Sequence, residues 1–341
     1  MNYTGKIIVL AYPDTFVTMS DEWICKLLPL VGLGTWEYIK AGHAALILIN
    51  NENGDARYFD FGRYVTPKGK GRVRGANTDA ELAIPVQAKL DDNSRELLNL
   101  NDFLHWLDAN PDKTHGEGRL LASVCDAIDF KKAEQYILDL QSRGSIPYGA
   151  FDKAGSNCAR FVTDTILHAT SEKRIIKALN FNKKFTPSGV GNVEKAALGA
   201  VYEVFDGAIT PFRGSALREN LVNYFGRKKK GVTTKSQTET PQIPAAAQRL
   251  TGIGCDAWFE LMSGEDGLPK SHYRIRRYNE LGNVDFDGVF YSEELRPEVP
   301  FEFTYDSHCA FCHVIQNDNK IRLDVIAPYA LFNSSQKVRS A

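Results

Sequence analysis

A cysteine at an expected helix start is the residue best placed to do chemistry in this chain. Residues 155–162, Gly-Ser-Asn-Cys-Ala-Arg-Phe-Val, run from a small polar turn into an apolar-periodic segment. Cys158 then falls in the first helical turn, where unpaired N–H groups and the helix dipole favour the thiolate, the reactive form of cysteine. The same N–H groups can bind an oxyanion. Gly155 and Ser156 are small enough to let a substrate carbonyl approach, and Ser156 is a suitable N-cap.

A base for such a thiol is offered by His43. It follows Gly42 and opens the strongly apolar run 44–49, which indicates a buried strand. A ring at the start of a strand projects from the edge of a rigid sheet. A cysteine at a helix start and a histidine at a strand start are the two parts of a cysteine-nucleophile site.

A third group must orient the imidazole, and the next strand is where we expect it. Residues 50–55, Asn-Asn-Glu-Asn-Gly-Asp, are a strong hairpin signal. If the strands pair symmetrically about this turn, Asp60 is a diagonal neighbour of His43. Arg63 and Tyr64 lie equally close in register. We favour Asp60, because an acceptor fixes the imidazole tautomer and stabilises the imidazolium ion.

A purely structural interpretation of the same residues stays open. Cys158 shares an apolar helix face with Phe161, Val162 and Ile166, and cysteines at such positions are commonly buried core residues. His43 can equally be a strand-end histidine with its hydrogen bonds satisfied. The two residues alone therefore leave catalysis and packing as alternatives.

The elements that would position this pair are of mixed type. Hydrophobic periodicity predicts helices at 21–28, 94–107, 130–143 and 157–170. It predicts strands at 6–11, 44–49, 57–61, 72–75 and 81–89, and a strand or other buried segment at 119–128. This order of helices and strands indicates an α+β domain.

A composition shift divides the chain. Residues 227–247 begin with Arg-Lys-Lys-Lys and contain almost no large apolar side chains, which is typical of an exposed linker. Beyond it, alternating runs predict strands at 258–262, 273–278, 284–291, 301–305, 309–316 and 321–326. We therefore expect a domain over 1–226, a linker over 227–247, and a small antiparallel sheet or sandwich over 248–341.

Composition bounds the function. The chain has 341 residues, 43% hydrophobic and 24% charged, with a net charge of -1, so nothing draws it as a whole to nucleic acid or to a membrane surface. The N-terminal apolar run of about six residues is too short for a signal peptide, and no segment reaches the roughly 18 apolar residues of a membrane span. We expect a cytoplasmic protein, with its six cysteines as free thiols.

One other motif invites a functional interpretation. Residues 309–313, Cys-Ala-Phe-Cys-His, match the c-type haem attachment pattern, and with His308 they also suggest zinc. Haem attachment normally requires export, and in an extended strand Cys309 and Cys312 point to opposite faces. We therefore interpret them as ordinary strand residues and expect neither a cofactor nor a metal.

The segments around the cysteine and histidine resemble a known family. Residues 157–162, Asn-Cys-Ala-Arg-Phe-Val, with Tyr148 upstream and Gly-His-Ala-Ala-Leu at 42–46, are similar to motifs of the circularly permuted NlpC/P60 papain-like proteins. That group includes lecithin:retinol acyltransferase-like enzymes and bacterial YaeF/YiiX relatives. The order also fits, because His43 precedes Cys158 as in the permuted group. The resemblance covers about residues 1–225, and the layout also resembles two-domain proteins of Bacteroidetes bacteria.

The resemblance implies Cys158 as nucleophile, His43 as general base and a polar residue of the next strand as orienter. Ala159 and Arg160 stand where the acyltransferase branch has Glu and His, so this chain departs from that branch. We expect an enzyme that hydrolyses an amide or related acyl bond in a peptide-like or small acyl substrate through a Cys158 acyl-enzyme.

The alternatives are a papain-like binding module without activity and a lipid acyltransferase or thioesterase. Candidate cleft residues are Tyr148, Asn157, Ser156, Tyr12 and Trp36. We expect no nucleic-acid partner and no membrane-spanning segment. The sequence names no protein partner for the β domain.

Overall fold

The computed structural model describes residues 3–18, 38–149, 152, 154–184, 187–225, 242–262 and 267–339. Within them the chain forms two compact units that are not continuous in sequence. The first consists of residues 1–62, 71–76 and 82–232, and the second of 63–70, 77–81 and 233–341. The α+β class, with a β domain at the C-terminal end, is confirmed. No helix in the described ranges is long and apolar enough to cross a membrane.

The first unit is built on an antiparallel sheet with the strand order β10-β9-β7-β1-β4-β5-β6-β8. Its central strands are nearly continuous apolar runs, because both faces are covered. The strand bounds are β1 (Gly5–Tyr12), β4 (His43–Asn50), β5 (Ala56–Gly62), β6 (Lys70–Gly75), β7 (Leu120–Ile128), β8 (Ile146–Pro147), β9 (Val201–Phe205) and β10 (Ala208–Pro211). The short strands β2 (Val17–Thr18) and β3 (Tyr38–Ile39) pair with each other.

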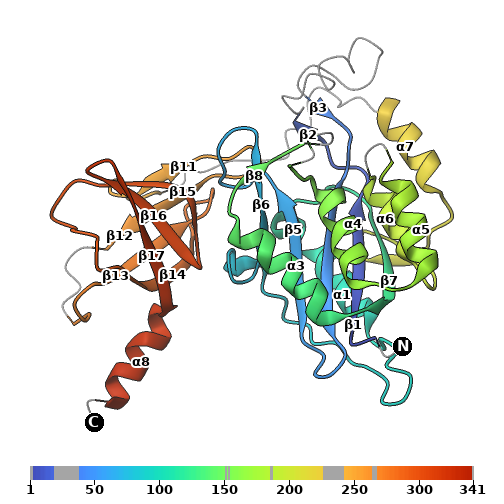
Figure 1. Ribbon diagram of the computed structural model, residues 1–341, viewed down its shortest axis with the longest axis horizontal. Coiled ribbons are helices and arrows are strands. Elements are labelled where there is room, and N and C mark those ends of the chain that lie inside the picture. Colours follow the sequence, from blue (N-terminus) through green and yellow to red (C-terminus); the bar gives the residue numbers. More distant parts are fainter. Residues whose placement is uncertain are drawn as a thin grey trace. The chain divides into compact units, whose positions relative to one another are not determined.

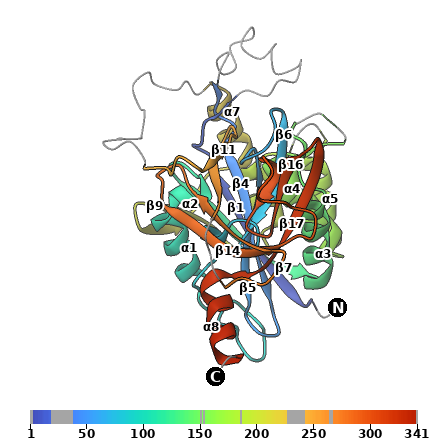
Figure 2. The ribbon, with the colours of Figure 1, turned by 90° about the vertical axis from the view of Figure 1, so that its left-hand side faces the viewer.

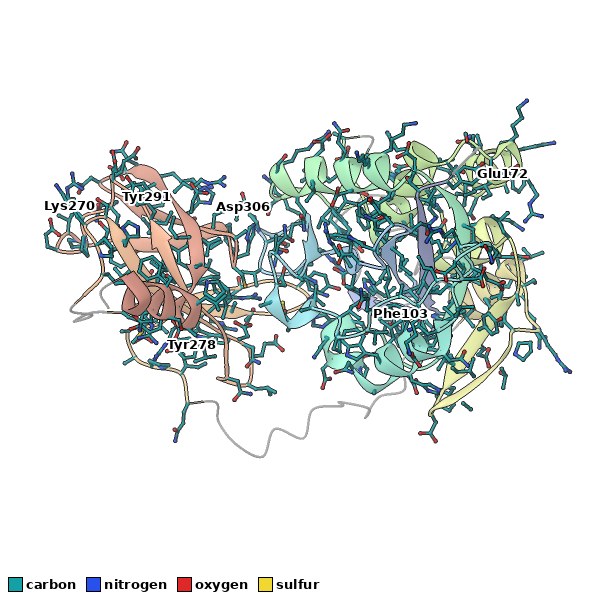
Figure 3. The ribbon with its side chains drawn as sticks, turned by 90° about the horizontal axis from the view of Figure 1, so that it is seen from below. Phe103, Glu172, Lys270, Tyr278, Tyr291 and Asp306 are labelled. Atoms are coloured by element: carbon teal, nitrogen blue, oxygen red, sulfur yellow. The ribbon has the colours of Figure 1, made fainter. Side chains whose placement is uncertain are left out.

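Helices cover the two faces of this sheet unequally. One face carries α3 (Phe130–Ser142), α4 (Cys158–Ala169), α5 (Lys173–Asn182) and α6 (Gly189–Ala196), and α7 (Ala216–Phe225) packs on α6. The other face packs against α1 (Leu100–Ala109), followed by the short α2 (Pro111–Thr114). Figures 1 and 2 show α1 on the side of the sheet opposite to α3, α4 and α5. Phe103 of α1, labelled in Figure 3, is fully buried there.

The expected hairpin forms with the expected register. The Asn50 N–H donates to Asp55 O at 2.9 Å, and Gly54 takes a φ of 72° that favours glycine. Ala45 pairs with Asp60, which makes Asp60 the diagonal neighbour of His43. The predicted strand at 6–11 and the predicted helix at 130–143 are also confirmed, and of the two alternatives for 119–128 the structure has the strand.

Two expectations for this half were less accurate. The predicted strand at 81–89 is wrong: it contains the 3₁₀ turn η2 (Ala80–Leu82) and then irregular chain. Its alternating apolar residues Leu82, Ile84 and Val86 instead lie against the α1 side of the sheet. The helix predicted from 94 begins only at Leu100. The predicted helix at 21–28 lies outside the described residues.

The second unit is one antiparallel sheet with the order β11-β12-β13-β14-β17-β16-β15, followed by a helix. Its elements are β11 (Gln248–Leu250), β12 (Ala257–Leu261), β13 (His272–Tyr278), β14 (Val284–Tyr291), β15 (Glu302–His308), β16 (Phe311–Gln316), β17 (Asn319–Pro328) and α8 (Tyr329–Arg339). The predicted strands of this half are confirmed to within a few residues, and α8 was not anticipated. Most of the expected linker, 227–247, lies outside the described residues.

Segments 63–70 and 77–81 join this second unit through hydrogen bonds and apolar packing. The Gly254 N–H donates to Arg63 O at 3.0 Å, and the Cys309 N–H donates to Thr78 O at 3.0 Å. Val65 is 1% exposed within the apolar core of the unit. Two short pieces of the N-terminal half are therefore part of the C-terminal β unit.

A buried arginine connects segment 77–81 to the sheet of this unit. The Arg277 guanidinium lies 3.2 Å from Asp79 Oδ1, 3.8 Å from Glu81 Oε2 and 3.7 Å from Asp285 Oδ2. It also donates to Cys309 Sγ at 3.5 Å. Burial raises the pKa of Asp285 to about 7, although the charge of Arg277 opposes this rise. This cluster therefore holds more carboxylates than cations.

The Cys309–His313 motif lies at the hairpin between β15 and β16. Cys309 occupies the turn, and β16 begins at Phe311, so the expected strand start at 309 was two residues early. Cys309 and Cys312 are both buried, and burial raises the pKa of each thiol. No group of three or more metal-ligating side chains in the described ranges is arranged to hold an ion.

Candidate active site

Cys158 is the first residue of α4, as the sequence indicated. The helix begins there because the Asn157 side chain accepts a hydrogen bond from the Arg160 N–H at 2.8 Å. Asn157, and not Ser156, is therefore the N-cap, and its extended backbone is typical of that position. The thiol is 9% exposed, and Phe161 and Val162 of the same helix are fully buried in the core.

The turn before Cys158 is held by the Arg160 guanidinium. Its Nη1 donates to Asp152 O at 2.5 Å and to Gly155 O at 3.0 Å. Ser156 forms backbone hydrogen bonds with the strand segment around Tyr148, donating to Pro147 O and accepting from the Gly149 N–H, each at 3.0 Å. A Cβ on Gly155 would lie 2.4 Å from Pro147 O, so only glycine fits this close approach.

His43 begins β4, beside the end of β1, where it pairs with Tyr12. Gly42 precedes it with a φ of 72°, a backbone conformation that favours glycine and lies directly before the start of the strand. The His43 ring is 7% exposed and stacks on Tyr12 with ring centroids 6.3 Å apart. Tyr12 therefore contacts the His43 ring.

The His43 Nε2 atom lies 3.4 Å from Asp60 Oδ2. Because Nε2 is the ring nitrogen on the Asp60 side, we assign Nδ1 to the Cys158 thiol, which also acts on the pKa of His43. The structure thus brings together Cys158, His43 and Asp60, the three residues that the sequence suggested for catalysis. Arg63 and Tyr64, the alternatives to Asp60, belong to the second unit.

Asp60 is held by two groups that sequence reasoning missed. Arg74, directly opposite on β6, binds it through Nε at 3.0 Å and through Nη2 at 2.6 Å, and the Tyr58 hydroxyl donates at 3.1 Å. Asp60 and Arg74 are 0% and 1% exposed. A buried carboxylate needs such a partner, and an Arg–carboxylate pair with two parallel bonds is among the strongest. The alternation Arg-Val-Arg at 72–74 was the available signal, but the β5–β6 register was not predictable.

The electrostatics of this chain of residues favour a thiolate–imidazolium pair. Burial disfavours the imidazolium, but hydrogen bonds to Asp60 and Cys158, with their charges, raise the pKa of His43 to about 9. Burial also opposes the thiolate, yet the hydrogen bond and charge of His43 more than offset it and lower the pKa of Cys158. Burial acts on Asp60 in the same direction, but the charge of Arg74 holds its pKa well below the usual range.

Backbone N–H groups complete the surroundings of the sulfur. Hydrogen bonds from the backbone of Ala44 and Ala159 also favour the Cys158 thiolate. The N–H groups of Cys158 and Ala159 belong to the first helical turn, where no carbonyl of the same helix is available to them. This arrangement can stabilise negative charge on the sulfur and on an oxygen bound beside it.

The remaining candidate cleft residues are placed as follows. Tyr148 is partly buried and stacks on Phe61 with centroids 5.8 Å apart, next to the turn that carries Ser156. A Cβ on Gly71 would lie 2.8 Å from the Tyr148 ring, so this glycine makes room for it. Trp36 lies outside the described residues.

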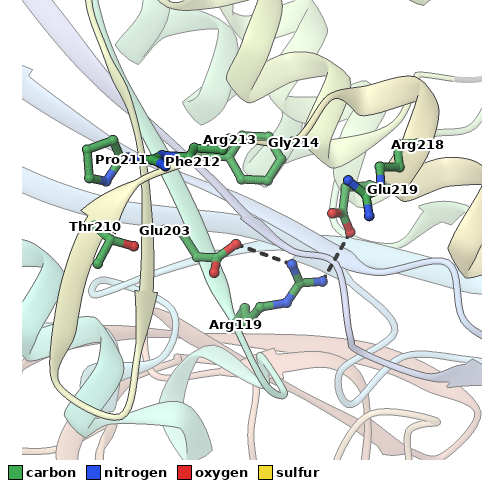
Figure 4. A pocket seen from close by; sticks show the side chains of 9 residues that line it. All are labelled: Arg119, Glu203, Thr210, Pro211, Phe212, Arg213, Gly214, Arg218 and Glu219. Carbon is green, nitrogen blue, oxygen red and sulfur yellow. Dashed lines mark hydrogen bonds and ion pairs between the residues drawn. The ribbon is translucent and has the colours of Figure 1, made fainter.

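A pocket of about 570 Å³ lies elsewhere in the first unit, between β9, β10 and α7. Within it Arg119 is bound by Glu203 at 3.2 Å and by Glu219 at 3.0 Å, as Figure 4 shows. Neither Cys158 nor His43 lines this pocket. The chemistry of the Cys158 site therefore has to be judged from its own groups.

Comparison with known proteins gives the following similarities. Residues 7–175 match a family model described as Type VI secretion system effector TseH-like, and residues 247–326 match the DUF6695 C-terminal domain. The protein in the crystal structure of the Type VI secretion system effector TseH has 21% sequence identity to this chain. The two structures match with a TM-score of 0.41, over 62% of this chain and 99% of that chain. No curated protein matches. The narrower resemblance to the YaeF/YiiX and lecithin:retinol acyltransferase-like group stays a prediction.

Proposed function

We propose that this protein is a cysteine hydrolase that cleaves an amide or related acyl bond through a Cys158 acyl-enzyme. The observation that carries this proposal is the buried chain of contacts from Cys158 through His43 to Asp60 and Arg74. Ordinary core packing does not require four ionisable groups in contact. Here they are ordered so that each stabilises the charged form of the next.

In the proposed reaction the resting pair is a thiolate and an imidazolium. The Cys158 sulfur attacks the acyl carbon and forms a C–S bond, while the carbonyl electrons move to oxygen and are stabilised by N–H groups at the start of α4. His43 then gives its Nδ1 proton to the leaving nitrogen as the C–N bond breaks. The products of this half-reaction are an amine and a thioester.

Water completes the cycle. Neutral His43 removes a proton from the water as its oxygen attacks the thioester carbon, and the C–S bond breaks to release the acid and the thiolate. Asp60 stays ionised throughout, because Arg74 neutralises it whether His43 is charged or neutral. Its role is to hold the ring with Nδ1 toward the sulfur.

Thiol labelling tests the nucleophile directly. At pH 6.5 we expect iodoacetamide to modify Cys158 first, because Cys125, Cys309 and Cys312 are buried with raised thiol pKa values. His43→Ala should abolish this preference, whereas Cys255→Ala, at a half-buried cysteine of the second unit, should leave it unchanged. Equally slow labelling of every cysteine in the wild-type chain would overturn the proposal.

Turnover tests the reaction class. A panel of fluorogenic peptide amides, small acyl amides and thioesters should contain a substrate that the wild-type protein hydrolyses and Cys158→Ala does not. Mass spectrometry should detect an acyl group on the Cys158 peptide with a slowly hydrolysed ester. Selective labelling without any acyl-enzyme across the panel would overturn hydrolysis and support a binding module that retains the cleft.

The matched family model suggests where such a hydrolase acts. The model is described as Type VI secretion system effector TseH-like, and we propose that this chain is likewise a secreted effector, whose activity arrests the growth of a bacterial cell that contains it. Expression with and without an added export signal, each beside its Cys158→Ala variant, tests this. Growth arrest that needs the export signal places the action outside the cytoplasm, and arrest without it supports the cytoplasmic setting expected from the sequence. Equal growth of wild type and variant in both arms would overturn the effector proposal.

A further inference from the structure

The residue that follows the nucleophile is held from outside its own helix. The Ala159 carbonyl accepts a hydrogen bond from Nδ2 of Asn192 on α6 at 2.7 Å, and it lies 2.9 Å from the Thr163 hydroxyl. Asn192 and Thr163 are both 0% exposed. A buried polar side chain between two helices is costly unless its hydrogen bonds are made, so this contact needs a reason beyond filling space.

The orientation of the Asn192 amide is set by its neighbours. Its Oδ1 atom accepts from Nδ2 of Asn182 at 3.0 Å and lies 2.7 Å from the Thr163 hydroxyl. With donors on the oxygen side, only Nδ2 can face the Ala159 carbonyl. The Thr163 hydroxyl has one proton and two possible acceptors, the Ala159 carbonyl and Asn192 Oδ1. Asn192 Nδ2 is therefore the donor that always serves the Ala159 carbonyl.

Further hydrogen bonds fix the start of α6, the helix that carries Asn192. The Ser188 side chain caps α6 by accepting from the Gly191 N–H at 2.9 Å, and Nδ2 of Asn220 on α7 donates to the same hydroxyl at 3.2 Å. The N–H of Asn192 donates to Ser188 O at 3.0 Å. The start of α6 is therefore itself fixed, and a side chain anchored on it is a stable reference point for α4.

We propose that Asn192 is a positioning residue for the Cys158 nucleophile. By holding the Ala159 carbonyl, it fixes the residue whose N–H is directed at the sulfur and the first turn in which an oxyanion would bind. The inference rests on the proposed function, since it assigns a role within the same site. The Asn192 side chain makes its hydrogen bonds to Ala159, Thr163 and Asn182 and not to the thiol, so it acts through Ala159.

The chain offers a matched control for this proposal. Ser123 of β7 is also 0% exposed and donates to Val193 O, the next residue of α6, at 2.7 Å. Ser123→Ala removes one buried hydrogen bond that holds α6 to the sheet, as Asn192→Ala removes those that hold it to α4. Asn192→Ala should lose more stability than Ser123→Ala, because it removes three side-chain hydrogen bonds and Ser123→Ala removes one, and only Asn192→Ala should affect the sulfur.

The test is the rate of Cys158 alkylation by iodoacetamide as a function of pH, with thermal unfolding measured alongside. For Asn192→Ala we expect the rate at pH 6.5 to fall about fivefold and the titration midpoint to move upward, which is the size expected for one ordinary hydrogen bond between neutral groups. Asn192→Asp keeps the shape of the side chain but places an oxygen acceptor opposite the Ala159 carbonyl. It should lower the alkylation rate in the same way, and it serves as the test if Asn192→Ala does not fold. Ser123→Ala should stay within twofold of wild type.

The outcomes separate this inference from the proposed function. If wild-type Cys158 is selectively reactive and both Asn192 variants keep its pH profile, Asn192 is only structural and the inference is overturned. If Ser123→Ala lowers reactivity as much as Asn192→Ala, general loosening of α6 explains the effect, and the inference is again overturned. If wild-type Cys158 shows no selective reactivity, the proposed function itself fails.

Discussion

The charge of Asp60 should decide where the proton of the Cys158–His43 pair resides. The pKa of His43 rises from 6.5 to about 9, which corresponds to about 3 kcal/mol in favour of the imidazolium ion. Asp60 and Cys158 supply that stabilisation against the effect of burial. If Asp60 supplies about half of it, neutralising Asp60 moves the proton equilibrium by about one pKa unit, or roughly tenfold.

The perturbation needs two substitutions. Asp60→Asn alone removes the carboxylate that binds the Arg74 guanidinium, which is 1% exposed, and breaking a buried pair in this way costs about 3–5 kcal/mol. Asp60→Asn combined with Arg74→Met removes both charges and keeps similar volumes. The double variant should fold, with a cooperative thermal transition and wild-type circular dichroism.

The assay is the alkylation rate of Cys158 between pH 5 and pH 10, followed by mass spectrometry. A thiol of ordinary pKa is about 1% ionised at pH 6.5, whereas a thiolate–imidazolium pair is largely ionised there. A thiolate of low pKa is also intrinsically less nucleophilic, so the expected loss of rate at pH 6.5 in the double variant is about tenfold. At pH 10 the two proteins should react at similar rates.

One result would refute this reasoning. If the folded double variant keeps the wild-type alkylation profile, the charge of Asp60 does not control the proton, and His43 with the backbone N–H groups around the sulfur accounts for the thiolate without it. A fall in rate that is equal at every pH would also count against it, because that result indicates altered access to the thiol.

Three further predictions follow from the same structure. Hydrolysis by the wild-type protein should decline as the pH rises through about 9, because deprotonated His43 has no proton for the leaving group, and a pH–rate profile still rising at pH 10 would contradict this. Asn157→Ala should lower the free energy of unfolding by about 1 kcal/mol through loss of the cap on the Arg160 N–H, whereas Asn157→Asp should keep the cap but slow alkylation by placing a carboxylate beside the thiolate. In the second unit, the raised pKa of Asp285 means that the folded state binds more protons than the unfolded state between about pH 4 and 7, so the free energy of unfolding should decline as the pH rises through that range. Asp285→Asn should flatten this pH dependence in thermal unfolding, and the variant should fold because Arg277 still has Asp79 beside it.

The local patterns of the sequence predicted the parts of the candidate site well. The small turn before Cys158 and the apolar period after it indicated a helix start, and the Asn-Gly turn set the β4–β5 register that brings Asp60 diagonal to His43. These predictions succeeded because the relevant contacts lie within a few residues or across one hairpin. The predicted strand at 81–89 failed because alternation reports which side chains pack inward, and Ile84 and Val86 are partly buried against the core without pairing with another strand.

The contact between Cys158 and His43 depends on the tertiary structure. Along β4, His43 shares its face with Ala45 and Ile47, which pack on the α1 side, whereas Cys158 packs on the other side of the sheet. The two groups come into contact because each is the first residue of its element, at the end of the sheet.

The same holds for the residues that support the site. Arg74 reaches Asp60 through a strand register that no turn signal specified, and Asn192 reaches Ala159 from a helix 33 residues away in sequence. The sequence by itself determined which residues can act as nucleophile, base and orienter, since that depends on residue type and local conformation. Only the fold decided which charges are paired out of water and which carbonyl is tethered, because these contacts depend on packing between distant segments.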